Sequence, residues 1–155
     1  MTGALFSQLD GTLREGDWTI EISFVEFSKH VKEPLTGTDV AVVLDALNAD
    51  GQRSFKTIWL QAKSLPSAPA KHTSAPRMAS QLPLAEAYCE ASYGLVYSPD
   101  GVHVLGAANE PEPLHTTMGR AVQCHIGDTT VGALKNSLNR KRLLQVLATE
   151  SVTAL

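Results

Sequence analysis

Two β-branched, apolar runs lie close together in the sequence, and they constrain the fold more than any other feature does. The runs are residues 37–44 and residues 57–63, and both are rich in side chains that favour strands. The segment 48–51 between them has the sequence Asn-Ala-Asp-Gly, which is typical of a tight turn. We therefore predict two antiparallel strands joined by a hairpin.

The length of the turn decides which side chains of the hairpin share a face. A three-residue loop over 49–51, with its glycine at positive φ, brings Asp39 opposite Gln61. Because side chains on a strand alternate between faces, Asp39, Gln61 and Lys63 then lie together at the end of the hairpin away from the turn. This register gathers a carboxylate, an amide and an ammonium in one place.

A shorter turn would separate the same groups. If Asp50 and Gly51 alone form the turn, Asp39 pairs with Ala62, and the amide and the ammonium move to the other face. A slip of one residue reverses every side chain of a strand in this way. The sequence leaves both registers open.

The remaining patterns predict a mixed sheet with helices. Residues 18–24 alternate between apolar and polar, which predicts a half-buried strand and hence a three-strand antiparallel meander with the hairpin. This pattern loses its phase at Val25 and Phe27, as at a bulge or strand end. A helix after Lys63 would let the next strand run parallel to the one that ends there. We predict a helix within 5–13, a loop over 64–83, a helix over 84–92, strands over 93–97 and 102–105, a helical turn or two over 114–120, a short strand over 121–126, and a helix over 129–147 capped by Asp128 or Thr129.

Length and composition indicate one ordinary globular domain. The chain has 155 residues, of which 43% are hydrophobic and 19% charged. A net charge of -3 disfavours a protein that coats nucleic acid without specificity, because such binding depends on neutralising phosphates. There is no apolar run of about 18 residues and no basic-then-apolar leader, so we expect no membrane insertion and a cytoplasmic location. Cys89 and Cys124 lack CxxC spacing and are expected to be free thiols.

The order of these motifs resembles a known family. An Asp that begins one strand, a following strand that ends in Gln-x-Lys, and then a helix and a strand are similar to the PD-(D/E)XK, or restriction endonuclease-like, nuclease superfamily. The resemblance spans residues 18–105. It implies an α/β fold with a mixed central sheet of about five strands flanked by helices, in a single nuclease-like domain over 1–155. It also implies a Mg²⁺-dependent or Mn²⁺-dependent DNA endonuclease, in a bacterial or phage defence setting where Gln-x-Lys members tend to appear.

The resemblance implies a role for each polar side chain. Asp39 would be a metal ligand, Gln61 a second ligand through its side-chain oxygen, and Lys63 the catalytic lysine that positions or activates the attacking water. Gln in place of the commoner Glu gives the metal one fewer negative charge, which favours weak binding or an inactive site.

An upstream carboxylate is expected to complete the metal site. Superfamily members usually begin with a helix that carries a glutamate, and only Glu15 follows the predicted helix over 5–13. Glu21, Glu26 and Glu33 are the further candidates. We favour Glu26, because it lies where the alternation of the first strand breaks.

Two other functions stay open at this point. The first alternative to the nuclease is a nuclease-fold protein that no longer cuts and serves as a binding or scaffolding module. The second is an unrelated α+β interaction domain. For the nuclease the expected partner is DNA, and the sequence leaves open a homodimer or fusion to a larger effector protein.

Overall fold

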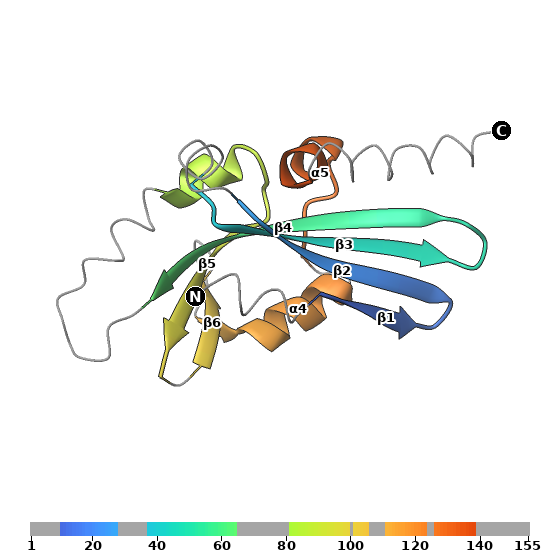
Figure 1. Ribbon diagram of the computed structural model, residues 1–155, viewed down its shortest axis with the longest axis horizontal. Helices are drawn as coiled ribbons and strands as arrows, with labels where there is room; N and C mark the ends of the chain where they lie inside the picture. Colours follow the sequence, from blue (N-terminus) through green and yellow to red (C-terminus); the bar gives the residue numbers. More distant parts are fainter. Residues whose placement is uncertain are drawn as a thin grey trace.

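Seven strands form one sheet in the order of the chain (Figure 1). The computed structural model describes residues 10–27, 37–64, 81–99, 101–105, 111–123 and 126–138. Every neighbouring pair of strands is antiparallel except β4 and β5, which are parallel. The strands are β1 (Gly11–Glu15), β2 (Trp18–Glu26), β3 (Val40–Asn48), β4 (Arg53–Ser64), β5 (Ser92–Ser98), β6 (Gly101–Leu105) and β7 (Glu112–Pro113), and the helices are α4 (Leu114–Val122), α5 (Val131–Ser137) and residues 81–86.

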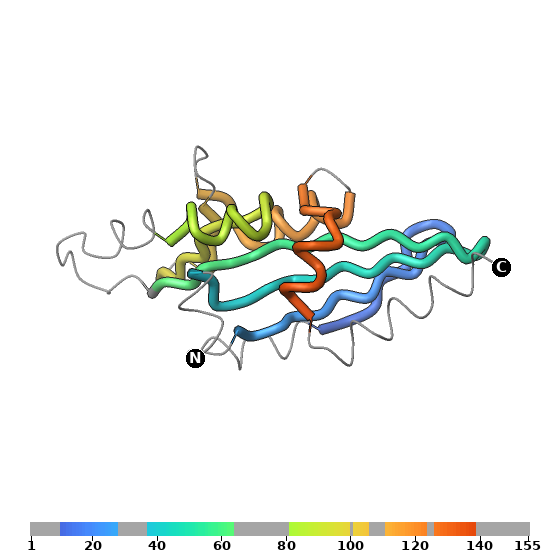
Figure 2. The backbone as a smooth tube through the Cα atoms, turned by 90° about the horizontal axis from the view of Figure 1, so that it is seen from above, coloured from blue at the N-terminus to red at the C-terminus, as the bar shows by residue number. Residues whose placement is uncertain are grey.

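The sheet is strongly curled, and the described helices are few and short (Figures 1 and 2). The predicted α/β arrangement, a restriction endonuclease-like sheet of about five strands flanked by helices, is therefore wrong. Two additional strands, β1 and β7, extend the sheet beyond the predicted ones. The helix predicted from residue 129 begins at Val131, and Leu138 after it has an extended backbone (φ -85°, ψ 152°).

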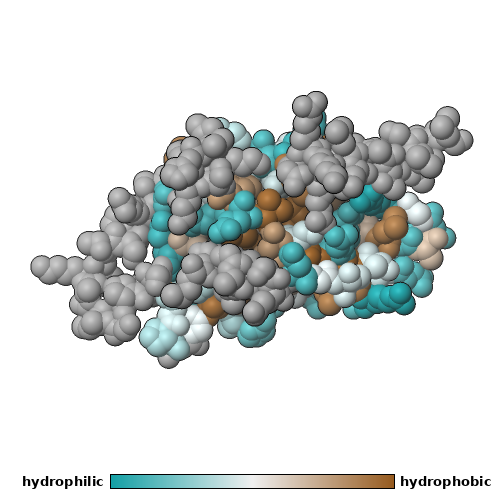
Figure 3. Space-filling model, in the orientation of Figure 1, coloured by the Kyte–Doolittle hydropathy of each residue, from teal (hydrophilic) through white to brown (hydrophobic). Residues whose placement is uncertain are grey.

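The first strand, β1, replaces part of a predicted helix. The predicted helix over 5–13 rests on three leucines spaced by four, Leu5, Leu9 and Leu13. Leu13 is instead 44% exposed on this edge strand. Gly16 takes a positive φ of 57° in the turn that follows, so that β1 folds back and pairs with β2. Residues 5–9 of the predicted helix lie outside the described residues. Figure 3 shows hydrophobic surface toward the end of the molecule where this turn and the β3–β4 hairpin lie.

The predicted hairpin is confirmed with its three-residue loop. The backbone N–H of Asn48 donates to the Gln52 carbonyl at 3.0 Å, and Gly51 has φ +78°. The register from this turn pairs Val40 with Leu60 at the other end. The antiparallel meander of β2, β3 and β4 and the parallel pairing of β4 with β5 are confirmed as well.

The two central strands carry the core, and helices lie on both faces of the sheet, α5 above it and α4 below it in Figure 1. On one face, Trp59 is fully buried and donates its indole N–H to Ser137 of α5 at 2.8 Å. The same indole meets the edge of Phe27 at 5.0 Å and stacks on Tyr88 at 6.1 Å, measured between ring centroids. On the other face, α4 places Ala121 against the core. A short strand predicted over 121–126 is therefore wrong at its start, because Ala121 and Val122 end α4.

Among the described helices, none combines the length and the apolarity that crossing a membrane would require.

Candidate functional site

Asp39 and Gln61 meet at the end of the hairpin away from its turn. The side-chain Nε2 of Gln61 donates to Oδ2 of Asp39 at 2.7 Å, and the backbone N–H of Ala62 donates to the same oxygen at 2.8 Å. Gln61 is 1% exposed, whereas Asp39 is half-buried. The structure thus brings together the carboxylate and the amide, as the register with the three-residue loop predicts.

The orientation of the Gln61 amide follows from the chemistry of its neighbour. A carboxylate only accepts hydrogen bonds, so the amide turns its nitrogen toward Asp39. Its oxygen, Oε1, is then buried without a hydrogen-bond partner in the described part of the chain. A buried acceptor left in this state costs about 1–3 kcal/mol. Oε1 is therefore a place where a hydrogen-bond donor or a cation would lower the free energy.

Lys63 lies on the same face of β4 as Gln61, two residues further along. Side chains on a strand alternate, and the register of β4 with β5 is continuous from Trp59 to Ser64. Lys63 is half-buried. Within the described residues it forms no ion pair with Asp39. Lys63 therefore shares a face of the sheet with Asp39 and Gln61, but its ammonium is not bonded to the Asp39 carboxylate.

The favoured upstream carboxylate, Glu26, does not join this group. Glu26 pairs with Val40 in an unbroken register, so it points to the face opposite Asp39, and it is exposed. The bulge expected near Val25 is absent from this strand. Phe24 and Val25 point to opposite faces of β2 and are both half-buried against core clusters, which is why the apolar alternation disappears there. Glu33 lies outside the described residues.

The other two upstream glutamates are placed away from Asp39. Glu21 shares its face but lies opposite Asp45, near the turn end of the hairpin. Glu15 ends the edge strand β1 and is exposed. The carboxylate expected to complete a metal site is therefore none of Glu15, Glu21 and Glu26.

Gly37 lies two residues before Asp39, and the close backbone contact that it makes was not predicted from the sequence. It has φ +65°, and a Cβ at this position would lie 2.8 Å from the backbone oxygen of Gln81. The backbone N–H of Phe27 then donates to the Asp39 carbonyl at 2.7 Å, which fixes the start of β3. The only sign of this contact in the sequence was Gly37 itself, two residues before Asp39.

The donor types suit a weakly held, hard divalent cation, but the Gln61 amide turns its nitrogen toward Asp39 and would have to rotate to offer Oε1 to the same ion. Asp39 offers a carboxylate, and Gln61 offers an amide oxygen, which are ligands that Mg²⁺ accepts alongside several waters. In the described ranges there is no group of three or more His, Cys, Asp or Glu side chains that would hold a metal tightly. No protein-family model matches the chain, and no curated protein matches it.

Asp128 is a buried carboxylate, and it organises the loop before α5. It accepts hydrogen bonds from the backbone N–H groups of Thr130 at 2.7 Å and Glu90 at 2.9 Å. Burial alone would raise its pKa, but these hydrogen bonds outweigh burial and lower the pKa below its ordinary 3.8. The cap of α5 is Thr130, whose side chain accepts from Ala133, so both predicted caps, Asp128 and Thr129, are corrected.

Acid is expected to weaken the fold through Asp128. A carboxyl whose pKa is lower in the folded state stabilises the protein above its unfolded pKa, and this stabilisation is lost as the pH falls toward the folded pKa. Asp128→Asn should lower the free energy of unfolding by about 1–3 kcal/mol at neutral pH, because one of the two acceptor oxygens of Asp128 is replaced by a donor nitrogen. The stability of this variant should then fall less than that of the wild type below pH 4. Urea unfolding measured from neutral to acid pH tests this, and parallel curves for both proteins would contradict it.

The thiol of Cys89 is expected to be unreactive in the folded protein. Cys89 is free and 1% exposed; burial, and next the charge of Asp128, raise its pKa to about 12. Reaction needs the thiolate, which is scarce far below the pKa. In a Cys124→Ser variant, dithionitrobenzoate should therefore label the protein only after denaturant is added. Rapid labelling in native buffer would show that Cys89 is accessible.

Proposed function

We propose that this protein is a metal-dependent phosphodiesterase that cleaves DNA. The observation that carries the proposal is the contact between Asp39 and Gln61, with Lys63 on the same face of the sheet. The Asp39 carboxylate, the Gln61 oxygen that lacks a partner within the described residues, and the Lys63 ammonium are groups suited to binding a cation and a phosphate together.

Each side chain has a separate task in the proposed reaction. Asp39 and, after rotation of its amide, Gln61 through Oε1 would hold a Mg²⁺ or Mn²⁺ ion. When bound, such an ion supplies positive charge beside the phosphate and lowers the pKa of a coordinated water. Lys63 stabilises the negative charge that grows on the phosphate oxygens as the water attacks. Asp39 also remains tied to the N–H of Ala62, which keeps the carboxylate at the end of β4.

Plasmid cleavage tests the proposal. Supercoiled DNA should be nicked with Mg²⁺ or Mn²⁺, EDTA should stop the reaction, and Asp39→Asn should abolish it. Asp45→Asn is the matched control, because Asp45 lies on the same face of β3 but is paired with Arg53 at the turn end, 2.7 Å from its Nε. Cleavage that survives in Asp39→Asn, or is lost equally in Asp45→Asn, would refute the assignment.

Replacing Gln61 by glutamate is expected to tighten metal binding. The new carboxylate adds a second negative charge beside Asp39, which attracts a divalent cation but repels Asp39 when no cation is present. Mn²⁺ affinity should rise about tenfold or more. The melting temperature should fall in EDTA and recover with Mn²⁺. Calorimetry and thermal unfolding measure both effects without any assay of cleavage.

A matched control for this substitution is available on the same strand pair. Gln52 is exposed beside the hairpin turn, and its side-chain oxygen accepts from Asn48 at 2.9 Å. Gln52→Glu therefore changes the charge by the same amount, far from Asp39. If both variants bind Mn²⁺ as the wild type does, Gln61 is not a ligand.

A second function, a binding module that no longer cuts, is favoured by one observation. Oδ2 of Asp39 already accepts two hydrogen bonds, and Gln61 presents nitrogen instead of oxygen to it. The pair is thus closed on itself in this arrangement. DNA binding without cleavage in any divalent cation, with no loss of binding in Asp39→Asn, would support this function over the nuclease.

A further inference from the structure

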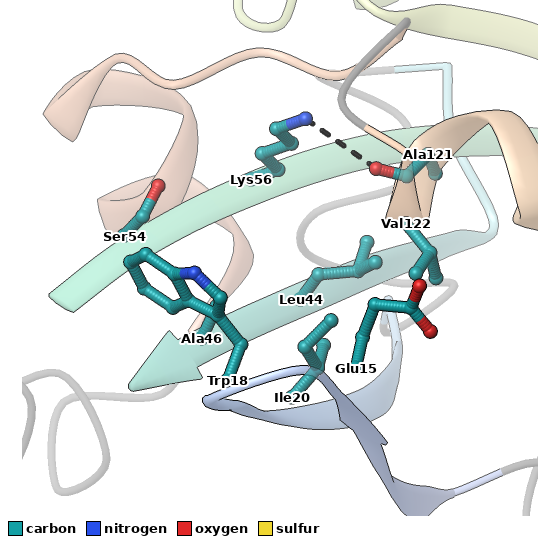
Figure 4. A pocket seen from close by; sticks show the side chains of 9 residues that line it. All are labelled: Glu15, Trp18, Ile20, Leu44, Ala46, Ser54, Lys56, Ala121 and Val122. Carbon is teal, nitrogen blue, oxygen red and sulfur yellow. Dashed lines mark hydrogen bonds between the residues drawn. The ribbon is translucent and has the colours of Figure 1, made fainter. Parts of the chain in front are cut away.

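A cavity of about 260 Å³ lies on the face of the sheet opposite Asp39 and Gln61, under the end of α4 (Figure 4). Its floor is apolar and is formed by Ile20 and Leu44, which are 6% and 4% exposed. Trp18 and Val122 form parts of its wall. Apolar cavities of ~150 Å³ are large enough for a benzene ring, so this one has room for a larger aromatic body.

Two opposite charges stand at different sides of the cavity. Figure 4 shows Lys56 and Glu15 separated by Leu44, with Lys56 reaching from β4 toward the end of α4. The Lys56 ammonium donates to the Ala121 carbonyl at 3.4 Å, a long contact. It has no carboxylate partner among the residues that the structure describes.

The Lys56 ammonium, which has no ion pair within the described ranges, indicates the charge of a ligand. Lys56 is half-buried, and a cation beside an apolar surface gains when an anion pairs with it. Glu15, on the other side, disfavours a second negative charge on the same molecule. A flat apolar body would lie against Trp18 and the floor, with its single anionic group at Lys56.

We propose that this cavity binds a small aromatic carboxylate with one negative charge. Trp18, Ile20 and Leu44 hold the ring system, and Lys56 pairs with the carboxylate. This site is independent of the proposed nuclease chemistry, because it lies on the opposite face of the sheet and uses none of the same residues.

Titration of the full-length protein with naphthoate, followed by proton–nitrogen NMR, tests the proposal. The indole N–H of Trp18 should shift, whereas that of Trp59, buried on the other face, should not. Naphthylmethanol, which has the same ring system without the charge, should bind about tenfold more weakly. Equal affinity for the two compounds, or an equal shift of both indoles, would overturn the proposal.

Variants separate the contribution of the Lys56 charge to binding from the contribution of the apolar cavity. Lys56→Gln should remove the preference for naphthoate over naphthylmethanol, and Ala46→Leu, which adds bulk to the lining, should weaken binding of both compounds. Lys135→Gln is the control, because it removes one exposed positive charge from α5, on the other face. A naphthoate preference that persists in Lys56→Gln, or disappears in Lys135→Gln, would show that the anion is not recognised by Lys56.

Discussion

Lys63→Ala is expected to slow DNA cleavage by about 10²–10³-fold while the fold stays intact. Removing one well-placed electrostatic group from a phosphoryl-type transition state typically costs ~3–4 kcal/mol of its stabilisation. Lys63 is half-buried near the end of β4 and forms no ion pair with Asp39 within the described residues. Removing its ammonium should therefore not leave the Asp39 carboxylate without an ion-pair partner that it had before. The measurement is the single-turnover rate with saturating Mn²⁺, beside circular dichroism of the folded protein.

The comparison with another lysine makes this experiment specific. Lys135 is exposed on α5, so Lys135→Ala should cleave at the wild-type rate. Lys63→Arg keeps the charge but changes its geometry, and it should retain part of the activity. If Lys63→Ala cleaves as fast as the wild type, the proposed role of Lys63 is wrong, whatever the fate of Asp39.

Trp59→Ala is expected to cost about 3–5 kcal/mol of stability, which is the usual cost of truncating a large core aromatic. Trp59 is fully buried between Phe27 and Tyr88. Its indole also donates to the Ser137 hydroxyl, which itself donates to the Ala133 carbonyl at 2.7 Å. The substitution therefore opens a cavity and leaves Ser137 with one bond fewer. Urea unfolding followed by circular dichroism gives the change in free energy.

Two further variants show which part of Trp59 matters. Trp59→Phe keeps most of the ring volume but loses the N–H donor, so it should cost less than Trp59→Ala. Leu47→Ala, on the neighbouring strand, should have little effect because Leu47 is 45% exposed. A loss below 1 kcal/mol in Trp59→Ala would mean that the aromatic cluster does not hold α5 against the sheet.

The hairpin could be predicted because its determinants are local. Gly51 supplies the positive φ that a three-residue loop needs, and the apolar strands on either side set the register outward to Asp39 and Gln61. The orientation of the Gln61 amide could not be predicted in the same way. It depends on the carboxylate and on the N–H of Ala62, which come together only in the folded sheet.

The fold class was wrong because tertiary pairing overrode local patterns. Leucines spaced by four predicted a helix that includes Leu13, yet the turn at Gly16 pairs this segment with β2. Glu26 was favoured from a break in alternation near Val25, but the strand continues in register and turns that glutamate away from Asp39. Alternation marks a strand only while one of its faces meets solvent.

The single parallel junction in the sheet has a consequence for how the chain folds. The β1–β2 and β3–β4 turns are short, and the β2–β3 pairing can begin between Glu26 and Val40, so the first contacts of these strands close smaller loops at a lower entropic cost than the β4–β5 contacts do. The junction between β4 and β5 joins residues more than thirty positions apart, such as Leu60 and Tyr93. Folding slows as contacts become more distant in sequence. The meander is therefore expected to assemble early, and refolding to be limited by the step in which β5 docks on β4.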